Sequence, residues 1–144
     1  MKCKSFIPVL VLLTFFSCKK NDDRQAPTPP APKPLTGLNI TLDDESPANL
    51  SYNASINPSI KISFSAPLKQ SSAAGALKIT DSQGKTVPLT SSFGEKDSVL
   101  IVQPSAPLKN ISKYSFNIST SLQSAAGASL TTPVSLTFIT RIDS

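Results

Sequence analysis

The sequence contains no histidine and no tryptophan, and its only two cysteines, Cys3 and Cys18, lie near its amino terminus. Histidine and cysteine supply most zinc ligands, and histidine is the base of the serine–histidine–aspartate triad, so neither kind of centre can be assembled in the body of the chain. The same shortage removes a disulfide framework and a thiol nucleophile. We therefore expect no catalytic residue, no bound cofactor and no metal site.

Long apolar runs are also scarce, with one exception at the amino terminus. Residues 6–16 form an apolar run that follows two positive charges, Lys2 and Lys4. A helix that spans a bilayer needs roughly 20 apolar residues, whereas the core of a signal peptide needs ~7–15. We therefore assign residues 1–17 to a signal peptide.

The apolar run ends at Ser17-Cys18, which resembles the lipobox of bacterial lipoproteins, where the cysteine thiol is acylated and becomes the new amino terminus. Phe15 and Phe16 depart from the residues usual before that cysteine, a looser form similar to lipoproteins of Bacteroidetes. Each buried methylene of an acyl chain contributes ~0.8 kcal/mol to membrane binding. The resemblance implies that the chain is held to a membrane through lipid on Cys18.

A charged segment follows Cys18. Lysine followed closely by paired acidic residues resembles the signal that sends lipoproteins of this type to the outer leaflet of the outer membrane, which implies a protein exposed at the cell surface. The alternative is a soluble spacer, for which any charged residues would serve. The five residues are Lys19, Lys20, Asn21, Asp22 and Asp23.

Residues 18–36 comprise the lipidated terminus and a proline-rich linker. Five prolines in residues 24–36 exclude a helix or a sheet ladder and favour polyproline II. At ~3.1 Å per residue, the linker could hold a domain up to ~50 Å from the bilayer. We expect it to act as a stalk.

The charge of the mature chain is small. Removal of the signal peptide takes away Lys2 and Lys4, which leaves twelve basic and nine acidic residues, a net charge of +3 instead of +5. These charges are spread along the chain, whereas nucleic-acid binding needs a clustered basic face. We expect no nucleic-acid partner.

Residues 37–141 are expected to form one all-β domain. Short runs of alternating apolar and polar residues recur between turn signals, the pattern of a β-sandwich. In one run Tyr114, Phe116 and Ile118 should face the core, with Asn117 outward, and Pro88 inside another run marks an edge strand. No helical period is evident. The seven runs are 38–42, 59–65, 76–80, 85–89, 98–103, 113–120 and 133–140.

Three stretches in this order resemble the bacterial Ig-like domains of S-layer proteins and surface lipoproteins. They are ISFSAPLK at 62–69, VQPSAPLKNISKYSFNIS at 102–119 and AAGASLTTPVSLTFIT at 125–140. The resemblance implies an antiparallel Ig-like β-sandwich of about seven strands that serves as a scaffold or spacer. It also implies a tyrosine corner, in which the Tyr114 hydroxyl bonds the upstream backbone.

Two polar features are candidate sites in the domain. Asp43, Asp44 and Glu45 supply oxygens of the kind that calcium binds, but consecutive side chains seldom reach one ion, so a solvated loop is favoured. Asp97-Ser98-Val99 resembles the acceptor of the Bacteroidetes O-glycosylation system, which makes Ser98 a candidate modification site. The alternative for Ser98 is a plain strand residue.

The sequence therefore favours a non-catalytic, lipid-anchored surface module that acts as a spacer or presents an interaction surface. A second hypothesis is a glycan- or protein-binding module of a polysaccharide-utilisation system, although aromatics such as Tyr52 and Phe93 are few for a sugar platform. A third is that the chain is the N-terminal anchor portion of a longer glycoside hydrolase.

Overall fold

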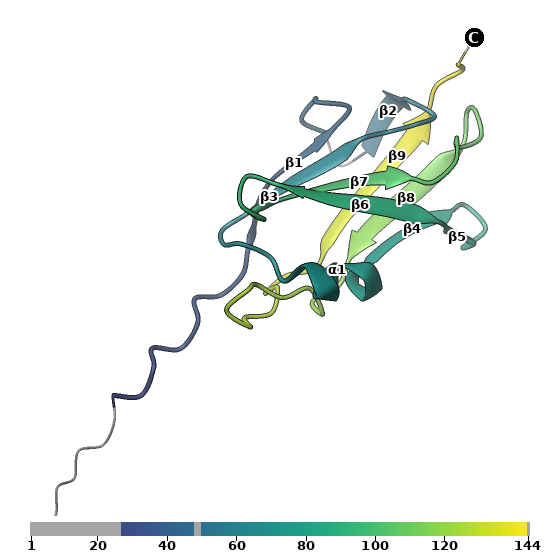
Figure 1. The fold of residues 1–144 in the computed structure, drawn as a ribbon. Coiled ribbons are helices and arrows are strands. Elements are labelled where there is room, and N and C mark those ends of the chain that lie inside the picture. The colour runs from purple at the N-terminus through teal and green to yellow at the C-terminus, as the bar shows by residue number, and fades with distance from the viewer. Residues whose placement is uncertain (1–26, 48–49, 144) are drawn as a thin grey trace, which may run out of the picture. The chain divides into compact units, whose positions relative to one another are not determined.

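The computed structural model describes residues 27–47 and 50–143. The folded body begins at Ala31. It consists of two β-sheets packed face to face, with one short helix at one end (Figure 1). The Ig-like sandwich expected from the sequence is confirmed.

The first sheet has four antiparallel strands in the order β1-β3-β7-β6, and the second has five in the order β2-β9-β8-β4-β5. Only β2 and β9 pair in parallel among the described strands. This is the strand order of an Ig constant-type sandwich, extended by one strand at each edge of the second sheet. The strands are β1 (Gly37–Leu42), β2 (Leu50–Ala54), β3 (Ile60–Phe64), β4 (Leu77–Asp81), β5 (Thr86–Val87), β6 (Leu89–Gly94), β7 (Val99–Pro104), β8 (Lys113–Ile118) and β9 (Val134–Thr140).

The core lies between the sheets and is built from alternate residues of the strands. Because successive side chains of a strand point to opposite faces, every second residue can be apolar and buried while its neighbours face water. The inward face predicted for β8 is confirmed. Strands β3 and β9 alternate in the same way, except that Val134 at the start of β9 is only half-buried. The buried members are Ile60, Ile62, Phe64, Tyr114, Phe116, Ile118, Leu136 and Phe138.

Pro88 lies where the chain passes from one sheet to the other. It separates β5, the edge of the five-stranded sheet, from β6, the edge of the four-stranded sheet. A proline cannot donate to a ladder, so this position between two edge strands leaves no ladder bond broken. The predicted edge strand is confirmed.

Three elements were not expected from the sequence. The strands β2 and β6 bring the count to nine, and the helix α1 (Gln70–Ala76) corrects the expectation that the domain has no helix. The helix is a seven-residue element that buries Ala73 and Ala76. The Ser72 hydroxyl holds it in place, donating to the Lys69 carbonyl (2.7 Å) and accepting from the Gln123 N–H (3.0 Å).

The chain enters and leaves the sandwich at opposite ends (Figure 1). At the entry pole, which also holds α1, Leu35 forms a parallel bridge with Leu130. From there β9 runs the length of the sheet to the exit pole, where the Arg141 N–H donates to the Ala54 carbonyl (2.8 Å). Leu35 is fully buried in the core although its position falls within the linker range inferred from the sequence.

Candidate functional site

The residues expected to anchor and export the protein lie outside the described residues. These are Cys18, the candidate lipidation site, and the export segment Lys19, Lys20, Asn21, Asp22 and Asp23. Within residues 27–47 and 50–143, no helix combines the length and the hydropathy needed to span a membrane. Lipidation and surface export therefore stay predictions from the sequence.

The acidic cluster forms a tight turn at the exit pole. Asp43 and Asp44 both have left-handed backbone conformations (φ 52° and 65°), and reciprocal backbone hydrogen bonds of 2.8 and 3.0 Å join Leu42 to Glu45. Positive φ at both central residues defines a type I′ turn, which aspartate tolerates. The sequence of this loop therefore suits the shape that the backbone adopts.

The carboxylates of Asp43 and Asp44 have partners within the domain. Asp43 accepts the backbone N–H groups of Ser55 (2.7 Å) and Ser59 (2.9 Å), so it holds the loop between β2 and β3. Asp44 forms an ion pair with Lys61 (2.9 Å) on the neighbouring strand. No group of three or more acidic, histidine or cysteine side chains in the described part of the chain is arranged to hold a metal. The cluster is thus a structural turn.

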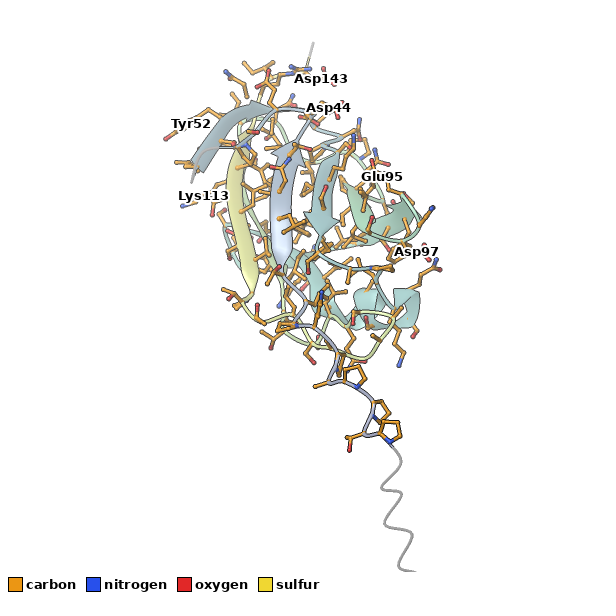
Figure 2. All side chains as sticks on the ribbon, turned by 90° about the vertical axis from the view of Figure 1, so that its left-hand side faces the viewer. Asp44, Tyr52, Glu95, Asp97, Lys113 and Asp143 are labelled. Atoms are coloured by element: carbon orange, nitrogen blue, oxygen red, sulfur yellow. The ribbon has the colours of Figure 1, made fainter. Side chains whose placement is uncertain are left out.

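A polar hollow of about 780 Å³ opens beside this turn, between the end of β1 and strand β2. Glu45, Tyr52 and Arg141 line it together with several serines. Tyr52 is 65% exposed and projects outward from β2 (Figure 2). The volume falls within the ~300–1,000 Å³ usual for ligand sites, but the lining is more polar than such sites usually are. Sequence reasoning did not find this hollow because β2 was not recognised as a strand.

Ser98 lies in the loop between β6 and β7. Glu95 and Asp97 of the same loop are labelled in Figure 2. Its side chain is half-buried, and its hydroxyl donates to the Glu95 carbonyl (2.6 Å). The neighbouring Asp97 carboxylate accepts the side-chain amide of Gln70 from α1 (2.9 Å). A glycan on Ser98 would have to displace its hydrogen bond, and modification of this residue stays a prediction.

Tyr114, the second residue of β8, forms the expected tyrosine corner. Its hydroxyl accepts the Lys109 N–H (3.1 Å), and its ring stacks on Phe138 with centroids 5.8 Å apart. The side chain is buried, so it pins the loop before β8 to the core. The structural role predicted for this tyrosine is confirmed.

The sandwich, the strand order and the corner agree with a match between residues 38–140 and the family model for the bacterial Ig-like domain. The chain belongs to this family. No curated protein has a sequence that matches the chain.

Solved structures with a similar fold include domains of much longer proteins. This Ig-like chain resembles Escherichia coli alpha-2-macroglobulin with a TM-score of 0.55 and 17% identity. The match covers 78% of this chain and 6% of the macroglobulin chain. The N-terminal part of the bacterial S-layer protein SbsC gives a TM-score of 0.50 and 14% identity over 75% of this chain and 24% of that one. At these identities the likeness concerns the fold alone.

One similar structure is a protein of comparable size. CopC from Methylosinus trichosporium OB3b matches with a TM-score of 0.55 and 16% identity, over 74% of this chain and 93% of that chain. The Ig-like fold therefore occurs both as a small protein and as a module within long chains. Fold alone does not select between these two arrangements for this chain.

Proposed function

We propose that this Ig-like chain is a non-catalytic module, anchored by lipid at Cys18 to the outer membrane and exposed at the cell surface, where it acts as a spacer. The observation that carries the proposal is the separation of the two poles. The chain enters beside Leu35 and leaves beside Ala54 at the other end of the sandwich, so the segments before and after the domain attach to opposite ends of it. A spacer needs this arrangement and needs no reactive group.

Lipidation at Cys18 is tested by metabolic labelling with an alkyne fatty acid. The unaltered protein should carry the label, and Cys18→Ala should not, because Cys3 lies within the predicted signal peptide. Label that persists on Cys18→Ala would exclude the anchor.

Surface exposure is tested by adding a protease to intact cells. The domain should be released from cells that make the unaltered protein. Replacement of Asp22 and Asp23 by alanine should protect the domain, because the paired acidic residues carry the resemblance to an export signal. Equal digestion of both proteins, or of neither, would rule out that signal.

A second candidate function, favoured by the hollow at the exit pole, is binding of a surface glycan or protein. Tyr52 offers an exposed ring, and Glu45 and Arg141 offer charged groups that bond hydroxyls. Glycan-array and pull-down binding should weaken in Tyr52→Ala and persist in Ile111→Ala, a control residue with a similar exposure of 68%. Binding that Tyr52→Ala leaves intact would remove the hollow as its site.

A third candidate is that the chain is the anchor portion of a longer glycoside hydrolase. The part of this hypothesis that concerns a longer chain is favoured by the macroglobulin and S-layer structures, of which the match to this chain covers only 6% and 24%. The coding sequence downstream of Ser144 decides between the hypotheses. A catalytic domain in the same reading frame would support the anchor of an enzyme over the simple spacer.

A further inference from the structure

The two strands that join the ends of the chain to the sandwich run in the same direction. Strand β1 follows Leu35 from the entry pole, and β9 reaches the exit pole at Thr140 (Figure 1). A pull on the two ends of the domain therefore acts along the strands. Hydrogen bonds between strands lie across this direction, so a sliding displacement loads many of them together.

At the entry pole the chain is fastened before β1 begins. The Leu35 carbonyl accepts the Thr131 N–H (3.0 Å), and the Leu35 side chain is fully buried. Thr36 and Ser65 are joined twice, because the Thr36 N–H donates to the Ser65 hydroxyl and the Ser65 N–H donates to the Thr36 carbonyl, each at 3.0 Å. Strand β1 then pairs with β3 along its length. An outward pull must shear these contacts together.

At the exit pole the last strand is held on both sides. Strand β9 pairs with β8 over six residue pairs, and β2 covers its other side from Thr137 to Thr140. Beyond the strand, the Arg141 N–H donates to the Ala54 carbonyl (2.8 Å), and the Thr140 hydroxyl bonds the Lys109 carbonyl. The exit segment is therefore secured to β2 and to the loop before β8.

The parallel pairing of β2 with β9 places a second barrier behind the first. If β1 slides away from β3, the load passes along the chain to the start of β2 at Leu50, which pairs with Thr137. Because β2 and β9 run in the same direction, a pull on the start of β2 and on the end of β9 again shears the pair. We call the β1–β3 pairing and the β2–β9 pairing, with the contacts that flank them, the two clamps. They would have to break one after the other.

We infer that the domain has a load-bearing function: it carries tension between Leu35 and Arg141 and resists unfolding in that direction more than across its sheets. The inference rests on the proposed anchored spacer for its biological use. The mechanical property itself is measurable on the isolated protein, so it stands or falls independently of surface exposure.

The test compares two pulling directions in the same protein by single-molecule force spectroscopy. Residues 19–144 contain no cysteine, so introduced cysteines are unique attachment points. Lys33→Cys with Asp143→Cys pulls end to end. Gln83→Cys with Asp143→Cys pulls across the five-stranded sheet, because Gln83 lies in the turn between β4 and β5 at the exit pole. At a common load we expect the unfolding rate to be at least about tenfold lower in the end-to-end pull than in the transverse pull. Several hydrogen bonds must break in one step end to end, and each bond lowers the unfolding rate by roughly twofold to tenfold.

Two further substitutions identify the clamps. Ser65→Ala removes the hydroxyl that accepts the Thr36 N–H, and Arg141→Pro removes the N–H that bonds Ala54. Each should speed end-to-end unfolding about twofold to tenfold. Ser65→Ala should leave transverse unfolding unchanged, whereas Arg141→Pro weakens a contact that any pull on residue 143 loads, so this variant is read in the end-to-end direction alone. Ser82→Ala, an exposed residue in the turn between β4 and β5, is the control and should change neither rate.

Equal unfolding rates in the two directions would overturn the inference. So would a Ser65→Ala variant that unfolds faster by the same factor in both directions, because that result would mean a general loss of stability and no directional clamp. If a clamp variant fails to fold, the two cysteine pairs without any substitution at the clamps still decide the question, because they compare the two pulling directions directly.

Discussion

Truncation of Phe116 tests the central strand of the sandwich. Phe116 is fully buried in β8, where it pairs with Ile79 of β4 on one side and Leu136 of β9 on the other. Phe116→Ala removes a ring enclosed by both neighbouring strands, and such truncations cost about 3–5 kcal/mol through lost transfer energy and the cavity left behind. A domain of this size has a free energy of unfolding of only ~5–15 kcal/mol.

The variant should therefore lose a large share of its stability. One kilocalorie per mole lowers the melting temperature of a domain this small by ~4–8 °C, so calorimetry should record a fall of more than about 10 °C. Asn117→Ala is the matched control, because Asn117 lies next along β8, points to the outer face and contributes one side-chain bond with Ser135. We expect it to cost no more than about 1 kcal/mol. If Asn117→Ala proved the more damaging substitution, the faces of β8 would be reversed and the assignment of the core refuted.

Three further substitutions probe the corner, the entry segment and the acidic turn, each measured by urea denaturation. Tyr114→Phe should cost about 1–2 kcal/mol, because it removes the hydroxyl that satisfies a part-buried backbone N–H. Leu35→Ala should lower the free energy of unfolding by about 2–5 kcal/mol, because the side chain is fully buried. Leu38→Ala, at a leucine that is 66% exposed, should lower it by under about 0.5 kcal/mol. Equal effects would place the entry segment outside the core. Asp43→Asn should lower the free energy of unfolding by about 1–3 kcal/mol, because it weakens two hydrogen bonds to backbone N–H groups. Asp44→Asn loses only an exposed ion pair and should lower it by less than about 1 kcal/mol. The reverse order would contradict the assigned roles.

The strands that could be predicted from sequence are those with several apolar residues at every second position. Strand β8 has Tyr114, Phe116 and Ile118 on its inner face, and β3 has Ile60, Ile62 and Phe64. Such alternation fixes both the strand and its faces, because a shift by one residue would expose every core side chain. The tyrosine corner was implied by the resemblance to bacterial Ig-like domains, and it agrees with the need of a buried tyrosine hydroxyl for a hydrogen-bond partner.

The elements that sequence reasoning missed have few apolar residues. In β6 a serine, Ser91, separates Leu89 from Phe93 on one face, so the alternation is hard to recognise. In β2 only Ala54 is buried, and a register shift between Ser51 and Ala54 breaks the period. The helix α1 is built from small residues and buries two alanines, too little for a helical period to be visible. The hollow at the exit pole was missed for the same reason as β2, which forms one of its walls.

The parts that a sequence pattern does not reveal are also the parts that hold the two ends of the chain. Leu35 follows a run of prolines and has no alternating neighbours, yet its side chain is fully buried and its carbonyl is bonded across the entry pole. Arg141 follows the last strand and is held through its backbone N–H, a group that every residue except proline possesses. Fastenings of this kind depend on which backbone segments meet, and composition carries little information about that. The alternating pattern therefore predicts the core of an Ig-like module, whereas the resistance of that module to a pull depends on contacts that only its three-dimensional structure makes visible.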